Sequence, residues 1–183
     1  MADVIGRVPP HNSDAEIALL GAVLFRSKAL DEVQGSLDKE DFYTKAHQYI
    51  WQGILDLHND RPDVTIDLVT LTDYLSEQGV IAECGGVPYI ASLTNTVPTS
   101  TNASYYAQII KNLSLKRKLL ELSVVIGDKA FDATEDVKSS IDQLDEKLSA
   151  LSSNIDTEKY LPSGKYIYKV IDQIHARMSG EME

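Results

Sequence analysis

Four histidines, His11, His47, His58 and His175, are the first residues to consider for metal binding or acid–base chemistry. His47 and His58 fall on one predicted helix, but they are eleven positions apart, which corresponds to about 16 Å along a helix axis. Two side chains that far apart do not bind one metal ion, and the sequence holds neither an HExxH motif nor a Cys/His ligand spacing. We therefore interpret His47, which precedes Trp51 by one helical turn, as a packing residue and predict no metal site.

The only Gly-Lys pair, Gly164-Lys165, is the one place where a phosphate-binding loop could occur. A Walker A loop needs a glycine five residues before Gly164 and a serine or threonine after Lys165, because its backbone N–H groups and that hydroxyl hold the phosphates and magnesium. The sequence has Lys159 and Tyr166 there. We predict that this chain binds no ATP through such a loop and has no cofactor of its own.

Cysteine and carboxylate residues give no better candidate for catalysis. Cys84 lies in a turn-like stretch, residues 83–86, without a second cysteine or a basic neighbour, so we interpret it as structural. Adjacent carboxylates such as Asp145-Glu146 are typical of a solvated helix face, and no grouping indicates an activated nucleophile. The residues alone predict an interaction domain without catalytic residues. A small enzyme with an unrecognised carboxylate site stays open as an alternative.

The charge of the chain is strongly acidic and unevenly distributed. The formal net charge is −11, with 6 Lys and Arg against 15 Asp and Glu in residues 1–100, and 11 against 13 in residues 101–183. Such a surface disfavours sequence-independent binding of nucleic acid by this chain itself. We interpret the one basic run, Lys116-Arg117-Lys118, as a solvated helix face. The lone cysteine, the absence of a signal peptide and the absence of an apolar run near 18 residues predict a cytoplasmic protein that does not bind a membrane.

Residues 1–101 have the pattern of a compact helical head. A capping box, Ser13 and Glu16, predicts the start of a first helix, and Asp67 predicts the cap of a third helix that runs from Leu68 to Gln78 and stops at Gly79. Pro88 predicts the first position of a fourth helix. No stretch predicts a substantial sheet, so the fold class is all-α. The residues expected to face the core are Ile17, Leu20, Val23, Leu24, Ala46, Ile50, Ile54, Leu57, Leu68, Leu71, Leu75, Ile90 and Leu93.

Residues 102–153 contain two long helical patterns with heptad-like apolar spacing. Joined at about residues 132–136, they predict a long antiparallel helical hairpin. A first arm of about 30 residues is roughly 45 Å long, so it projects beyond the head and needs a surface to pack against. We therefore predict an association device. Its first seam is Tyr106, Ile110, Leu113, Leu120, Val124 and Phe131, interrupted by Arg117 and Gly127; its second is Val137, Ile141, Leu144, Leu148, Leu151 and Ile155.

Residues 154–183 are predicted to be a linker that carries one amphipathic helix at about 165–179. A short helix after a linker cannot bury its apolar stripe on itself, so it must dock on its own domain, on another subunit or on a further segment. The chain then stops at Glu183 without a closing element, so we expect it to be one part of a longer protein. The stripe consists of Ile167, Val170, Ile171, Ile174 and Met178.

Five stretches of the sequence read PPHNSDAE (9–16) continuing to Leu20-Gly21, DFY (41–43) with HQYIW (47–51), IDLVTL (66–71), GGVPYIASL (85–93) and ASYYA (103–107) continuing to IIK (109–111). Together they resemble the N-terminal domain of the DnaB-type bacterial replicative helicase. Their order and spacing over residues 7–125 carry the resemblance, and the segment around 166–178 is similar to the linker helix of that family.

The resemblance implies a non-catalytic N-terminal collar domain, at residues 1–153, of a ring-shaped hexameric helicase. The parent would unwind DNA with ATP and magnesium in a RecA-like C-terminal domain that lies beyond this chain. The collar is expected to pair as dimers through the hairpins, to bind primase, and to reach DNA only within the full ring. The linker helix is expected to dock on the motor domain of a neighbouring subunit, through Ile167, Val170, Ile171 and Ile174.

Carried over by position, the resemblance also assigns residues to the hairpin. Its turn, with Asp132, Glu135 and Asp136, is the expected primase contact. The residues expected to pack the hairpin and pair the subunits are Leu120, Val124, Ile141, Leu144 and Leu148. A stand-alone helical adaptor, or a DNA-binding protein with a helix-turn-helix between Ile66 and Leu93, is the alternative, although that region is too acidic for a typical recognition helix.

Overall fold

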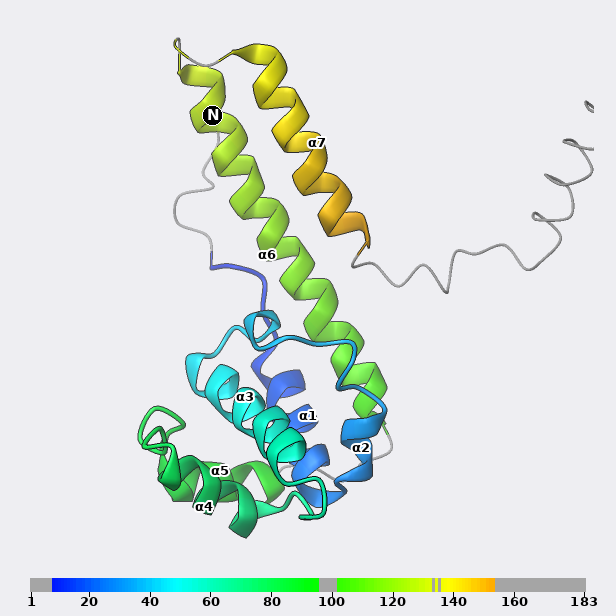
Figure 1. Cartoon of the computed structure of the whole chain (residues 1–183), viewed down its shortest axis with the longest axis vertical. Helices are drawn as coiled ribbons and strands as arrows, with labels where there is room; N and C mark the ends of the chain where they lie inside the picture. The colour runs from blue at the N-terminus through cyan, green and yellow to red at the C-terminus, as the bar shows by residue number, and fades with distance from the viewer. Residues whose placement is uncertain (1–7, 96–101, 133, 135, 154–183) are drawn as a thin grey trace, which may run out of the picture. The chain divides into compact units, whose positions relative to one another are not determined.

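The computed structural model describes residues 8–95, 102–132, 134 and 136–153 (Figure 1). The predicted linker helix with Ile167, Val170, Ile171 and Ile174 lies outside these residues, as does Glu135. Within the described residues there are helices and no strands, which confirms the all-α fold class. The elements are α1 (Ser13–Phe25), α2 (Lys28–Asp31), a 3-10 helix η1 (Lys39–Asp41), α3 (Lys45–Asp60), α4 (Leu68–Glu77), α5 (Gly86–Asn95), α6 (Ala103–Phe131) and α7 (Val137–Ser153).

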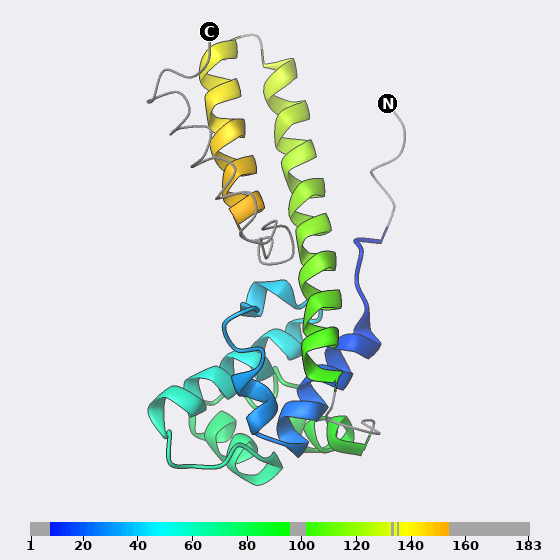
Figure 2. The same cartoon turned by 90° about the vertical axis from the view of Figure 1, so that its right-hand side faces the viewer.

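The chain divides into two compact units, Met1–Gly127 and Asp128–Glu183. The first unit holds α1 to α5 and most of α6, whose first turns lie against the head (Figure 2). The second unit holds α7 and is described here by itself. The antiparallel packing of α7 on α6, and the predicted domain boundaries at residues 101 and 153, therefore stay predictions.

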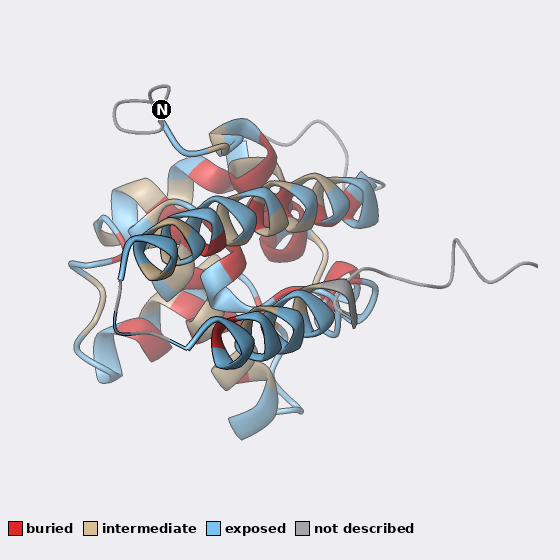
Figure 3. Ribbon diagram, turned by 90° about the horizontal axis from the view of Figure 1, so that it is seen from above, coloured by how far each residue is buried: buried red, intermediate tan, exposed pale blue. Residues whose placement is uncertain are grey.

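The core of the first unit lies between α1, α3, α4 and α5. Trp51 on α3 is fully buried, and its indole N–H donates to the Leu37 carbonyl at 3.2 Å. Helix α1 packs against both α3 and α5, and α4 packs against α3 and α5. The helices bury one side and expose the other, as the colours of Figure 3 show. Of the side chains expected to face the core, Leu20, Val23, Ile50, Ile54, Leu57, Leu71, Leu75, Ile90 and Leu93 are at most 1% exposed, whereas Ile17, Ala46 and Leu68 are only partly buried.

Two helix ends follow the sequence prediction closely. The Asp67 side chain accepts a hydrogen bond from the Thr70 backbone N–H at 2.9 Å and caps α4. Gly79 adopts a φ of +72°, the left-handed conformation that ends a helix, and the Val80 N–H returns to the Leu75 carbonyl at 3.0 Å. These contacts confirm both the cap and the stop signal.

Two predicted helix starts are wrong. The N-cap of α1 is Asn12, whose side chain accepts from the Ala15 N–H at 3.0 Å, because Glu16 is buried and binds α3 instead of closing a capping box. Helix α5 begins at Gly86, so Pro88 is its third residue. Among the described residues, no helix is long and apolar enough to cross a membrane.

Candidate interaction surface

Helix α6 is fixed to the head by a buried carboxylate, Asp41, at the end of η1. The side chain is fully buried and receives the Lys111 ammonium at 2.7 Å, the Ser114 hydroxyl at 2.7 Å and the Lys118 ammonium at 3.3 Å. Burial raises the pKa of Asp41, but these hydrogen bonds and the one from the Asp38 N–H outweigh it, so its pKa is below the ordinary value. The carboxylate is therefore charged at neutral pH and holds three positions of α6.

Arg117 adds a second attachment between α6 and the head. Its guanidinium donates to the backbone carbonyls of Pro10, at 2.9 Å, and Asp41, and it lies 5.8 Å from the centre of the Tyr43 ring. The interpretation of residues 116–118 as a solvated face is therefore wrong for two of the three residues. Arg117 donates to backbone carbonyls of the head, and Lys118 binds the buried Asp41 carboxylate. Lys116 alone of the three is exposed.

The face that α6 turns to the head also differs from the predicted seam. Its fully buried positions in the first half are Ala103, Ala107, Ile110 and Ser114, whereas Tyr106 and Leu113 are only partly buried. Small residues at three of these positions, Ala103, Ala107 and Ser114, allow the helix to approach the head closely. A pattern of large apolar residues does not indicate such a face.

A second buried polar cluster ties α1, α3 and α5 together. The Glu16 carboxylate accepts hydrogen bonds from the Tyr43 and Thr44 N–H groups and lies 2.6 Å from His47 Nδ1, while His47 Nε2 lies 2.6 Å from the Tyr89 hydroxyl. Burial raises the pKa of Glu16, but the hydrogen bonds from His47 and the backbone outweigh it and lower the pKa. The interpretation of His47 as a packing residue is confirmed, since it is 1% exposed.

The C-terminal half of α6 carries large apolar side chains that stay exposed. Leu120 and Val124 are 40% and 52% exposed and lie on one face, because they are four positions apart along the helix. Leu119 and Ile126 are 51% and 39% exposed but lie roughly 130° away around the helix. We call Leu120 and Val124 the α6 apolar face. An exposed apolar patch of this kind is typical of an association surface.

Helix α7 has an apolar stripe of its own. Ile141 and Leu148 are 59% and 44% exposed, Val137 is 73% exposed, and Leu144 is partly buried. At the start of the helix, Asp136 accepts a hydrogen bond from the Ser139 N–H at 2.9 Å, as an N-cap does. Asp132 is exposed and binds the Thr134 hydroxyl at 2.6 Å and its N–H at 2.9 Å, contacts that lower the pKa of its carboxyl.

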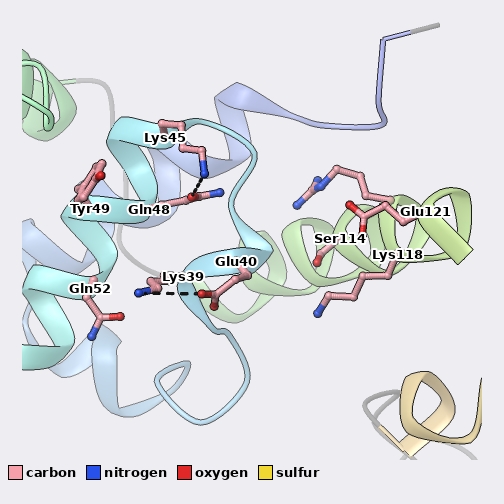
Figure 4. A pocket seen from close by; sticks show the side chains of 10 residues that line it. Lys39, Glu40, Lys45, Gln48, Tyr49, Gln52, Ser114, Lys118 and Glu121 are labelled. Carbon is pink, nitrogen blue, oxygen red and sulfur yellow. Dashed lines mark hydrogen bonds and ion pairs between the residues drawn. The ribbon is translucent and has the colours of Figure 1, made fainter. Parts of the chain in front are cut away.

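The root of α6 also borders a polar cleft of about 620 Å³ in the first unit (Figure 4). Its lining residues are Lys39, Glu40, Lys45, Gln48, Tyr49, Gln52, Ser114, Arg117, Lys118 and Glu121. Sequence reasoning missed both this cleft and the Asp41 cluster. The signal for the cluster was Lys111, Ser114 and Lys118, which share one helix face and so had to find a polar partner. Within the described residues, no group of three or more His, Cys, Asp or Glu side chains is arranged to hold a metal ion.

Comparisons with known proteins identify a family and several relatives. The family described as DnaB-like helicase N terminal domain matches residues 8–112. The chain is 30% identical to the replicative DNA helicase DnaC of Bacillus subtilis over 97% of this chain and 39% of that protein, and 36% identical to the replicative DNA helicase DnaB of Geobacillus stearothermophilus over 80% and 32%. It therefore spans well under half the length of these relatives.

Solved structures show the same fold. The crystal structure of the N-terminal domain of DnaB helicase from Mycobacterium tuberculosis matches with a TM-score of 0.72 and 32% identity, over 79% of this chain and 99% of that chain. A structure of a DnaB-like replicative helicase and its interactions with primase matches with a TM-score of 0.64 over 88% of this chain and 35% of that chain, at 22% identity, which supports the fold alone. The chain belongs to the DnaB-like helicase family and carries its N-terminal domain.

Proposed function

We propose that this chain is the non-catalytic oligomerisation and partner-docking domain of a ring-shaped replicative DNA helicase. The observation that carries the proposal is the α6 apolar face, which stays exposed on a helix whose root is bound to the head by Asp41 and Arg117. A rigidly held helix that exposes Leu120 and Val124 presents a defined surface to another copy of the chain. Together with the stripe of Ile141, Leu144 and Leu148 on α7, this face is the proposed hairpin packing and subunit-pairing surface.

The whole protein is proposed to unwind duplex DNA at the replication fork. This chain spans 39% or less of the helicases quoted above, so ATP hydrolysis with magnesium is assigned to the remainder, and DNA is reached only through the assembled ring. A cytoplasmic location follows from the same role.

The linker helix at 165–179 is proposed to dock on the motor domain of the neighbouring subunit. Ile171→Glu in the full-length protein should then weaken ring assembly in native mass spectrometry. Unchanged assembly would reject the docking.

The turn between α6 and α7 is the proposed contact for primase. Asp132 and Asp136 are exposed, which leaves their charges available to a basic partner surface. Changing Asp132 and Asp136 to Asn, and Glu135 to Gln, removes the charge while Asn at 136 still caps α7. We expect weaker primase binding in a titration by isothermal calorimetry, whereas unchanged affinity would place the contact elsewhere.

The subunit-pairing proposal is tested by co-purification of tagged and untagged copies of the chain. Wild-type copies should co-purify, and the double variant Leu120→Glu/Val124→Glu should not, because two buried charges at a pairing surface cost several kcal/mol. Val69→Glu is the matched control, since Val69 is 72% exposed on α4, away from the α6 apolar face. Equal co-purification of the double variant and the control, with unchanged helical circular dichroism, would contradict the proposal.

The alternative of a helix-turn-helix DNA-binding protein finds no support in α4 and α5. Residues 66–93 contain no lysine or arginine, and α4 carries Asp73 and Glu77. A recognition helix without cations would meet the phosphate backbone unfavourably. Pairing and docking therefore remain the function that the described residues support best.

A further inference from the structure

The polar cleft at the root of α6 gathers positive charge in an acidic protein. Residues 1–127 hold ten Lys and Arg against sixteen Asp and Glu, yet four of those ten cations, Lys39, Lys45, Arg117 and Lys118, line this one cleft with only two carboxylates, Glu40 and Glu121. The cations come from η1, α3 and α6, and Figure 4 shows Lys45 of α3 on one side, Lys118 of α6 on the other and Lys39 of η1 between them. Because the charged Asp41 carboxylate binds Lys118, three carboxylates stand against the four cations, and segments far apart in sequence build a site with one net positive charge.

Most hydrogen-bond donors of the lysines in the cleft are not used within the protein. Lys45 gives one hydrogen bond, to Gln48 at 3.1 Å, although an ammonium carries three donors. Lys39 lies 4.0 Å from Glu40 with its side chain 48% exposed, and Lys118 reaches Asp41 at 3.3 Å with its side chain 30% exposed. Arg117 is held by two backbone carbonyls and so supplies a charge of fixed position.

The character of the lining selects the class of ligand. Apart from Tyr49, the lining residues are polar or charged and contribute apolar surface through their aliphatic stems, so the cleft lacks the large apolar side chains that anchor a protein partner. A long nucleic acid would reach beyond the cleft and meet an acidic unit, because residues 1–127 hold ten Lys and Arg against sixteen Asp and Glu. A volume of about 620 Å³ lies within the range of small-molecule sites.

We propose that this cleft binds the phosphate group of a small phosphorylated molecule, with Lys39, Lys45 and Lys118 as donors to the phosphate oxygens. The carboxylates of Glu40 and Glu121 accept hydrogen bonds from hydroxyl groups, which favours a sugar phosphate or a nucleotide over bare phosphate. Such a ligand bridges the η1–α3 corner and α6, so it stabilises the attachment of α6 to the head. The site shares no lining residue with the α6 apolar face and does not depend on the proposed function.

The test is isothermal titration calorimetry of the 183-residue chain with inorganic phosphate, ribose 5-phosphate and ADP at constant ionic strength. We expect saturable binding at one site, weakest for inorganic phosphate. Lys39→Gln/Lys45→Gln should weaken binding by at least about tenfold, because each lost charged hydrogen bond is worth more than a factor of ten. The control Lys28→Gln/Lys116→Gln changes the net charge equally at two exposed lysines outside the cleft, and should bind as the wild type does.

A gain-of-affinity variant makes the test sharper. Glu121→Gln removes a negative charge from the lining but keeps a hydrogen-bonding group, so it should tighten inorganic phosphate binding severalfold. Four results would overturn the proposal: no saturable binding up to about 10 mM ligand, equal weakening in both lysine variants, citrate binding as tightly as ribose 5-phosphate, or a single-stranded oligonucleotide displacing ADP from the cleft. Sedimentation of the same samples reports pairing separately, so failure of this site and failure of the pairing surface are distinguishable.

Discussion

Asp41 shows how one side chain determines where a helix projects from the head. Its two carboxylate oxygens bind Lys111, Ser114 and Lys118, three positions on one face of α6. Nothing around Asp41 in the sequence distinguishes it from the fifteen other Asp and Glu residues of the region 1–127. Its partners lie 70 to 77 residues away, so only the tertiary fold identifies them.

Asp41→Ala should lower the free energy of unfolding by about 3 kcal/mol, because it leaves the partly buried Lys111 ammonium and the buried Ser114 hydroxyl without their acceptor. Urea unfolding followed by circular dichroism measures the change. Asp73→Ala, at an exposed position on α4, is the control and should stay within about 0.5 kcal/mol of the wild type. If both variants lose the same stability, Asp41 does not anchor α6.

Glu16 makes the stability of the head depend on acidity. Its pKa in the folded protein is lowered from 4.5, so its contribution is present above the unfolded-state pKa and is lost as the pH falls through the folded-state pKa. Glu16→Gln should lower the free energy of unfolding at neutral pH by about 2 kcal/mol. The free energy of unfolding of this variant should then fall less steeply than that of the wild type as the pH is lowered. Urea unfolding from about pH 7 to about pH 3 checks both; parallel curves for the two proteins would show that Glu16 is not the titrating group.

At the scale of the elements, the sequence predicted those helix faces and helix ends that depend on contacts between neighbouring residues. The stripes of α3 and α4, the Asp67 cap and the Gly79 stop depend on neighbours within one or two turns, and the structure confirms them. Helix α6 was placed correctly as a long helix, but its buried face was not, because Ala103, Ala107 and Ser114 are buried by close approach and hydrogen bonding. The spacing of apolar residues in the sequence predicts neither close approach nor hydrogen bonding.

Gly79→Ala should cost about 1 kcal/mol, because an alanine at a φ of +72° places its Cβ against the following carbonyl. Thermal unfolding measures the loss. The matched control is Gly35→Ala: a Cβ there meets nothing within 4 Å and its φ is not in the left-handed region, so no loss is expected. Equal losses at the two positions would mean that the left-handed turn does not determine the end of α4.

At the scale of the molecule, subunit pairing depends on apolar surface that the first unit does not cover. The family resemblance assigned Leu120 and Val124 to hairpin packing and subunit pairing, and the structure shows both side chains exposed on a helix held at its root. Whether α7 of the same chain or another copy covers them is a matter of assembly, which a single chain's local patterns do not determine. The heptad spacing of the stripe on α7 favours packing within the hairpin, and the exposure of the α6 apolar face favours pairing with another copy.

Sedimentation equilibrium of the unmodified chain tests the central claim most directly. A monomer has a mass of 20.2 kDa. We predict that the measured mass rises with concentration to at least twice that value, and that Leu120→Glu/Val124→Glu holds it at the monomer mass while Val69→Glu does not. A wild-type chain that stays at 20.2 kDa at every concentration up to its solubility limit would contradict the account.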